Sequence, residues 1–304
     1  MSRSIKDYVF LTLKGMAMGA ADVVPGVSGG TIAFISGIYE ELIGTISGIS
    51  LGLFKIWKEE GFQAFWKKSN ASFVLSLMLG MLISVFSLMK LVHFLLENHP
   101  IPLWAFFFGL VLASVIYIGK QISNWSISNI IGLILSAIGA FMITKLGVTQ
   151  GADSLGYLFF AGAIASCAMI LPGISGSFIL VLLGAYTTIT QAVHDMDLKK
   201  ITVVATGVIT GLLSFSHLLK WLFKNYKNTT LAILTGFILG SLNKIWPWKQ
   251  VLESIQIKDK IIPLKEASIL PSSYDGNPQI ELALLMAVIG FMLILGLEKL
   301  AQKK

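Results

Sequence analysis

The chain has 304 residues, of which 55% are hydrophobic and only 13% are charged, and its mean hydropathy is +0.79. A soluble domain carries about 25% charged residues, so this composition excludes an ordinary soluble protein and indicates one that crosses a membrane repeatedly. The net charge of +7 comes from lysines between apolar segments, and no basic–aromatic patch indicates nucleic-acid binding. The single cysteine, Cys167, excludes an internal disulfide framework.

Ten apolar segments follow one another along the chain. A helix needs about 20 apolar residues to cross a bilayer, and the third to fifth and the last three segments meet this length. The other four are short or interrupted by proline or acidic residues. The segments are 5–24, 27–52, 71–96, 102–119, 129–147, 155–171, 174–192, 201–223, 229–246 and 280–298.

Part of the sequence occurs twice. The stretch VVPGVSGGTIAFISGIY (23–39) matches ILPGISGSFILVLLGAY (170–186) at an offset of 147 residues, the distance from Pro25 to Pro172. The alignment includes identical Pro-Gly, Ser-Gly and tyrosine positions. Such a match predicts that the two stretches adopt the same local structure.

A second block matches at an offset of 127 residues, for example at Gly80 and Gly207. The chain therefore consists of two units of five segments, at about 5–147 and about 155–298. Because five is odd, the second unit must enter the membrane upside down relative to the first. The sequence thus predicts an inverted-topology repeat, a common transporter plan, within one membrane domain spanning 1–304.

The basic residues predict an orientation. With a cytoplasmic N-terminus, most of them fall on the cytoplasmic side, as the positive-inside rule requires, and the C-terminus is cytoplasmic too. The long segment 244–279 then lies outside as an external loop, whose role the sequence leaves open. The cytoplasmic set is Arg3, Lys6, Lys14, Lys55, Lys58, Lys67, Lys68, Lys120, Lys220, Lys224, Lys227, Lys299, Lys303 and Lys304.

Pro25 and Pro172 are the two prolines that interrupt apolar sequence, and they occupy equivalent positions. Short arms around a Pro-Gly break predict re-entrant helical hairpins, one from each face of the membrane. Two fully crossing arms would satisfy the same charge pattern. The expected fold is an all-α polytopic membrane protein in which each hairpin is followed by about three transmembrane helices.

The two Pro-Gly loops are candidate anion sites. Their glycines allow backbone N–H groups to converge, and a serine or threonine can cap the helix that follows. These features predict binding of a phosphate-like group at membrane depth; a helix break that only allows close packing is the alternative. The candidate residues are Pro25, Gly26, Ser28, Gly29, Gly30, Thr31, Pro172, Gly173, Ser175, Gly176 and Ser177.

Three ionisable residues border the first loop. Lys14 and Asp22 are eight residues apart and share a helix face, and Glu40 follows the repeated stretch. Asp22 is a candidate carrier of a proton or cation; the alternative is a carboxylate that accepts hydrogen bonds from nearby loop N–H groups. We expect Glu40 to line the inner mouth of a pathway.

Two Lys–His pairs align between the repeats, with the order of the residues reversed. Each pair lies on one helix face at spacing i, i+3, and the two pairs would lie toward opposite leaflets. They are candidates for gathering an anionic headgroup at each surface, with snorkelling near helix ends as the alternative. The four residues are Lys90, His93, His217 and Lys220.

The stretch DVVPGVSGGT (22–31), its echo LPGISGS (171–177) and the chain length resemble the prokaryotic polyprenyl-phosphate transporters, which share a plan with the DedA transporters. The resemblance implies a flippase-type transporter that returns undecaprenyl phosphate to the cytoplasmic face of the inner membrane for reuse in cell-wall synthesis. It also implies roles in phosphate binding for the loop residues and Asp22. Ser177 replaces a glycine of the family pattern, so the second loop departs from it.

Two other functions remain open from the residues. The same loops would serve a secondary transporter of a small soluble anion. The sequence GVSG (26–29) is also the nucleophile motif of an intramembrane serine protease. Such an enzyme needs a histidine next to the serine, but the candidates His93 and His217 lie toward helix ends. We therefore expect no enzymatic activity.

We expect no cofactor and no metal, and a proton or sodium is the candidate coupling ion. The expected partners are the lipid substrate and membrane lipids. The sequence leaves the oligomeric state open.

Overall fold

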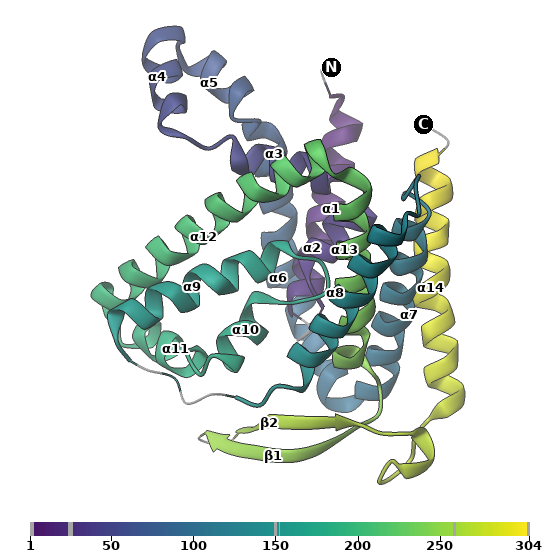
Figure 1. Ribbon diagram of the computed structural model, residues 1–304. Helices are drawn as coiled ribbons and strands as arrows, with labels where there is room; N and C mark the ends of the chain where they lie inside the picture. Colours follow the sequence, from purple (N-terminus) through teal and green to yellow (C-terminus); the bar gives the residue numbers. More distant parts are fainter. Residues whose placement is uncertain (1–2, 24–26, 149–150, 152, 258–259, 303–304) are drawn as a thin grey trace.

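The computed structural model describes residues 3–23, 27–148, 151, 153–257 and 260–302, and most of them are helical (Figure 1). The first half contains α1 (Ile5–Val23), α2 (Gly29–Ile35), α3 (Tyr39–Ser47), α4 (Leu51–Glu60), α5 (Phe62–Lys68), α6 (Ala71–Asn98), α7 (Pro100–Gly119) and α8 (Ile127–Lys145). The second contains α9 (Leu155–Ile170), α10 (Gly176–Leu182), α11 (Tyr186–His194), α12 (Leu198–Asn225), α13 (Lys227–Ser241), η1 (Leu242–Ile245), β1 (Lys249–Ile257), β2 (Lys260–Ser268), η2 (Pro271–Ser273) and α14 (Ile280–Gln302).

Four helices among the described residues are long and apolar enough to cross a membrane, namely α6, α7, α8 and α12. A fifth span is counted if α10 and α11 are taken together, although the pair is bent by 107°. Helices of this length satisfy all their interior backbone groups themselves, which a bilayer requires. The protein is therefore a mostly helical, multi-pass membrane protein.

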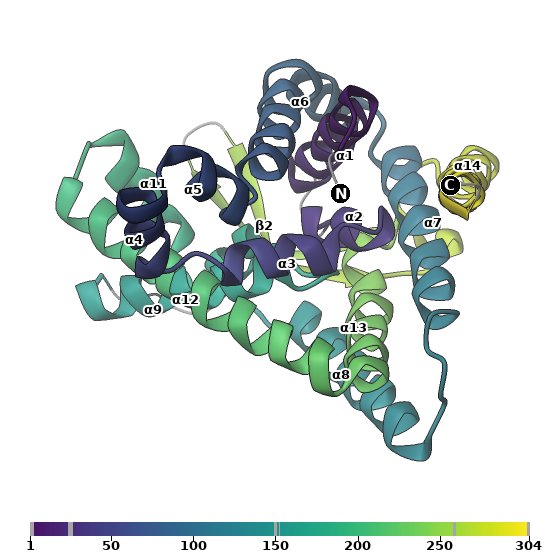
Figure 2. The same cartoon turned by 90° about the horizontal axis from the view of Figure 1, so that it is seen from above.

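Four pairs of helices make the closest contacts. α1 packs on α6 and α9 on α12, each within one half of the chain, whereas α7 packs on α14 and α8 on α13 across the halves (Figure 2). Glycines lie where the backbones approach: a Cβ atom on Gly80 would come within 2.0 Å of the Thr12 carbonyl oxygen, and one on Gly207 within 2.1 Å of the Phe159 carbonyl oxygen. Small residues at membrane helix contacts allow this approach.

The structure corrects the predicted boundaries in both repeats. The apolar segments 27–52 and 174–192 are each two helices, because the chain turns at Gly37 and Gly184, where φ is +74° and +63°. Glycine adopts this left-handed conformation without a steric penalty. The stretch between α3 and α6 contains two further helices, α4 and α5, whereas α11 is followed directly by α12 in the described part of the second half.

The mostly helical structure agrees with the expected all-α class, but the segment 244–279, predicted to be a loop, contains two strands. Residues 249–257 and 260–268 pair as an antiparallel hairpin, from Lys249 opposite Ser268 to Ile257 opposite Lys260. The indole N–H groups of Trp246 and Trp248 donate to the carbonyls of Ile269 and Pro278, at 2.8 and 2.9 Å. These bonds fasten the hairpin to the chain that leads into α14.

The two ends of the molecule differ. Both termini, α4 and α5 lie at one end, and the β-hairpin lies at the other (Figure 1). The predicted segment 229–246 is a 15-residue α-helix followed by a 3₁₀ turn, because the chain already turns toward the hairpin at η1. α7 ends at the end of the molecule that holds both termini, and α13 ends at the opposite end, which holds the β-hairpin and is called the hairpin end below.

Replacing Gly207 by alanine should destabilise the α9–α12 contact, because the added Cβ atom would overlap the Phe159 carbonyl oxygen. Overpacking of this kind costs about 1–3 kcal/mol. We expect a clearly lower melting temperature for the detergent-purified protein. Gly139→Ala in α8 is the matched control, since its Cβ atom would meet no atom within 4 Å. Equal melting temperatures for the two variants would contradict the assigned contact.

Candidate functional site

Hydrogen bonds join the described residues on either side of the first loop. Ser28 is the N-cap of α2, and its hydroxyl oxygen accepts a hydrogen bond from the Gly30 N–H at 3.1 Å. The Asp22 carboxylate accepts from the Gly29 N–H at 2.6 Å. A carboxyl group of the chain itself therefore already occupies a loop amide that the sequence assigned to a phosphate. Two other predicted members of this loop, Pro25 and Gly26, lie outside the described residues.

Helix α1 holds both ends of α2. Asp22 accepts from the first residue of α2, and the Lys14 ammonium donates to the carbonyl of its C-cap, Ser36, at 2.6 Å. An acid at the start and a base at the end of a helix are the arrangement that the helix dipole favours. The shared face predicted for these two residues thus corresponds to contacts at the two ends of one short helix.

The second loop has the same plan with fewer contacts. Pro172 and Gly173 are buried, and Gly173 has φ of +93°. Ser175 is the N-cap of α10 and accepts from the Phe178 N–H at 3.3 Å, with the Ser177 hydroxyl 3.4 Å away. A Cβ atom on Gly176 would come within 2.8 Å of the Ala165 carbonyl oxygen, so this glycine lets α10 lie against α9.

The two loops meet in the interior. The Gly173 N–H donates to the Thr31 hydroxyl oxygen at 2.8 Å. The Ser28 hydroxyl lies 3.4 Å from the Met169 carbonyl oxygen and 3.5 Å from that of Leu171. The structure therefore brings together predicted residues that are more than 140 positions apart in sequence.

The tyrosine of the first repeat completes this contact. The hydroxyl of Tyr39, a residue only 2% exposed, donates to the Ile170 carbonyl oxygen at 3.1 Å. Helix α9 ends here, so its last carbonyls have no partner further along the helix. An unsatisfied carbonyl in an apolar interior is costly, and hydroxyls from the first repeat take the place of the missing amides.

The two repeats differ at equivalent positions. Thr31 is buried and bonded across the loops, whereas its counterpart Phe178 carries an aromatic ring. Tyr39 is buried, but its counterpart Tyr186 is 39% exposed. Ser177 is exposed as well. Residues 27–31 of the first loop are thus buried, whereas the second repeat is exposed at Ser177 and Tyr186.

A cavity of about 430 Å³ lies beyond the far end of α2. Tyr39 and Glu40 line it from α3, and Tyr117 and Lys120 line it from the end of α7. Lys227 at the start of α13 pairs with Glu40 at 2.7 Å. Because α7 ends at the end of the molecule that holds both termini, the cavity lies there (Figure 1). A role of Glu40 at the mouth of a pathway stays a prediction.

The two Lys–His pairs are not among these contacts. All four side chains are exposed on α6 and α12. The His93 ring lies 3.3 Å from Glu97 on its own helix, and the His217 ring lies 2.7 Å from the Leu213 carbonyl oxygen, also on its own helix. A role of Lys90, His93, His217 and Lys220 in gathering headgroups stays a prediction.

Sequence reasoning missed several residues of the site. Tyr39 could have been found, because it is one of the few polar positions that the two repeats share. Tyr117 and Lys120 carry no motif and line the cavity because α7 ends there. Lys227 carries no motif either and pairs with Glu40 from the start of α13.

The fold and the loops define a multi-pass membrane protein with two broken helices that meet in its interior. Residues 18–261 match the family described as undecaprenyl phosphate translocase-like, and the chain belongs to this family. No solved structure is found to match the chain.

Two curated relatives carry the name polyprenyl-phosphate transporter. The one from Vibrio cholerae serotype O1 is 44% identical over 308 residues, which cover 100% of both chains. The one from Staphylococcus aureus is 35% identical over 254 residues, which cover 77% of this chain and 85% of the relative. The similarity to the first relative thus includes both loops and the hairpin segment.

Removing the Tyr39 hydroxyl should destabilise the protein, because the Ile170 carbonyl would lose its partner. Leaving a buried polar group unsatisfied costs about 1–3 kcal/mol. We expect Tyr39→Phe to lower the melting temperature more than Tyr186→Phe, its repeat counterpart, whose ring is partly exposed. A larger effect of the Tyr186 variant would contradict the assigned role of Tyr39.

Proposed function

We propose that the chain is a translocase of polyprenyl phosphate, undecaprenyl phosphate above all, in the cytoplasmic membrane of a prokaryote. The observation that carries the proposal is the contact between the loops at Ser28–Thr31 and Met169–Gly173, which separates the two ends of the molecule. The names of the two relatives supply the lipid. The prenyl chain would stay in the bilayer while the phosphate crosses the protein.

In this proposal the two halves form an inverted repeat with re-entrant hairpins. The helices α1, α2, α3, α6, α7 and α8 correspond in order to α9, α10, α11, α12, α13 and α14. The α1–α6 contact corresponds to α9–α12, and α8–α13 to α14–α7. An exchange of roles between such repeats gives alternating access around a fixed site. Both termini and the 430 Å³ cavity would face the cytoplasm.

The present structure would be a state in which the loops are closed. The Gly29 and Gly173 N–H groups are occupied by Asp22 and Thr31, so a phosphate could bind these amides only after the internal partners move away. Loop amides and hydroxyls would then replace the water around the headgroup. The Ser28 bonds in the described part of the chain are all with backbone atoms, which supports a structural and binding role over that of a nucleophile.

Asp22 offers a route for ion coupling. A carboxylate and a phosphate cannot share the Gly29 N–H without repulsion, so binding would favour a protonated or displaced Asp22. A proton is therefore the first coupling ion to test, with sodium second. Lys90, His93, His217 and Lys220 would attract headgroups at the two surfaces.

The direct test is flipping of undecaprenyl phosphate in proteoliposomes by wild type and by the double variant Ser28→Ala/Ser175→Ala. We expect the variant to flip about tenfold more slowly or worse, because both loops lose a hydroxyl that serves the backbone and the phosphate. Leaflet accessibility of the phosphate at successive times measures the rate.

The matched control removes two N-cap serines elsewhere, in Ser126→Ala/Ser154→Ala. Ser126 caps α8 and Ser154 caps α9, and each accepts a backbone N–H of its helix as the loop serines do. This control separates loss of a helix cap from loss of a loop hydroxyl. Equal rates for the loop variant and the wild type would contradict the proposed role of the loops.

A further inference from the structure

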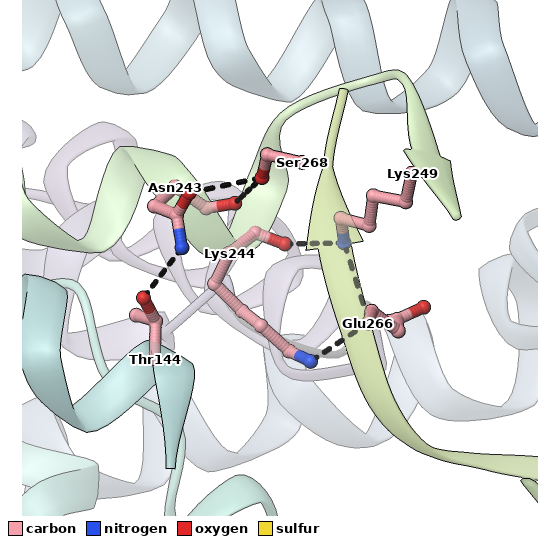
Figure 3. A network of polar contacts seen from close by, with 6 residues as sticks. All are labelled: Thr144, Asn243, Lys244, Lys249, Glu266 and Ser268. Atoms are coloured by element: carbon pink, nitrogen blue, oxygen red, sulfur yellow. Dashed lines mark hydrogen bonds and ion pairs between the residues drawn. The ribbon is translucent and has the colours of Figure 1, made fainter. Parts of the chain in front are cut away.

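A cluster of charged residues lies where the β-hairpin joins the helices (Figure 3). Lys244 in η1 and Lys249 at the start of β1 both point at one oxygen of Glu266 in β2, at 3.0 and 3.7 Å. Lys249 also donates to the Lys244 carbonyl oxygen at 2.5 Å. Two ammonium groups thus share a single carboxylate, and the cluster carries an excess of one positive charge.

The cluster is partly removed from water. The side chains of Lys244, Lys249 and Glu266 are 21%, 12% and 21% exposed. The Lys244 ammonium lies 5.0 Å from the ring centre of Phe178, and that of Lys249 lies 4.4 Å from the ring centre of Trp104. These rings stabilise the cations, but they supply no negative charge to balance the second lysine.

Burial and the neighbouring Lys244 lower the pKa of Lys249 to about 8, although Glu266 opposes this shift. The two ammonium groups hold the pKa of Glu266 below its usual range, although burial opposes this shift. The carboxylate is therefore ionised at neutral pH, and Lys249 remains largely protonated. A further negative charge would relieve the repulsion between the lysines.

The surroundings suit a phosphate. Thr144, Asn243 and Ser268 line the same cavity with hydroxyl and amide side chains, and Lys145, whose ammonium lies 4.4 Å from the ring centre of Phe141, lines it as well. The free space is about 30 Å³, enough for about one water molecule. A phosphate must therefore take the place of the Glu266 carboxylate. A phosphate monoester is well suited to do so, because it carries nearly two charges at pH 7 and more acceptor oxygens.

The location connects the cluster with the second loop. Phe178 lies under Lys244 and follows Ser177, the exposed serine of that loop, directly in the chain. Residues 27–31 of the first loop are buried, so the second is the one that a headgroup would meet first from this end. This end is opposite to the one that holds the 430 Å³ cavity and the termini.

We propose that Lys244, Lys249 and Lys145 form a binding site for a phosphate monoester at the hairpin end. The Glu266 carboxylate occupies this site in the present structure, and the phosphate displaces it. This inference rests on the proposed function for the identity of the lipid, but the site itself is defined by its own residues. The ligand is a phosphate monoester, either a lipid headgroup or a free anion.

Binding of glycerol 3-phosphate to the detergent-purified full chain at pH 7 tests the site without any transport. Lys249→Met should weaken binding about tenfold, because a charge-assisted bond is lost, whereas Glu266→Gln should strengthen it. If the ion pair were purely structural, neither variant would change the affinity for glycerol 3-phosphate, or both would lower it in parallel. Either result would overturn the proposal. Lys199→Met, at an exposed lysine in α12, is the matched control.

A pH series adds a readout that folding defects do not produce. Raising the pH from 7 to 9 removes the proton from Lys249, while the Glu266 carboxylate and the monoester dianion keep their charges. Wild-type affinity should fall over this range. Lys249→Arg should keep its affinity at pH 9, since a guanidinium stays charged. Equal losses in both proteins would contradict the role of Lys249.

Flipping of undecaprenyl phosphate that starts from the leaflet at the hairpin end separates the two sources of phosphate. If the lipid is the ligand, Lys249→Met raises the lipid fraction needed for half-maximal rate and Glu266→Gln lowers it. Unchanged flipping with altered binding would keep the phosphate site and assign it to a free anion. Absence of flipping by the wild type would count against the proposed function, and the binding result would still decide the site.

Discussion

The backbone N–H and C=O groups at two broken helices need hydrogen-bond partners inside the protein, and the rest of the structure depends on this constraint. Helix α9 ends at Ile170 inside the protein, where Pro172 prevents its continuation and leaves its last carbonyls without amide partners. Hydroxyls of the first repeat, from Ser28 and Tyr39, take over these carbonyls. The interior loops can exist in an apolar surrounding because each supplies partners to the other.

Because each loop supplies hydrogen-bond partners to the other, the two loops can close against each other and can also separate when other partners take over. The bonds that join the loops are hydroxyl contacts of 2.8–3.5 Å, and no ion pair crosses between the described residues of the two loops. A phosphate presents the same kind of acceptor oxygens as the carbonyls and the Asp22 carboxylate, so an exchange of partners leaves few groups unsatisfied. Two ion-paired clusters lie at the two ends instead, Glu40 with Lys227 at one and Glu266 with its two lysines at the other.

The sequence predicts the parts of the fold that depend on local pattern. The long apolar helices, the helix breaks near Pro25 and Pro172, and the capping roles of Ser28 and Ser175 follow from composition and spacing, and the described helix ends agree with them. The turns at Gly37 and Gly184 were missed because an apolar run continues through each of them. The β-hairpin and its charged cluster were missed because Lys244 and Glu266 meet only through strand pairing, which leaves no mark at a distance of 22 residues.

The central claim is that the loops must separate for the phosphate to cross. The most direct measurement is flipping of undecaprenyl phosphate by Ser28→Cys/Leu171→Cys in a Cys167→Ala background, with the new pair oxidised or reduced. The Ser28 hydroxyl lies 3.5 Å from the Leu171 carbonyl oxygen, so the two loops pass close to each other at these positions. The account predicts that the cross-linked protein does not flip the lipid and that reduction restores the rate of the same variant before oxidation. Equal flipping by the fully cross-linked and the reduced protein would contradict it.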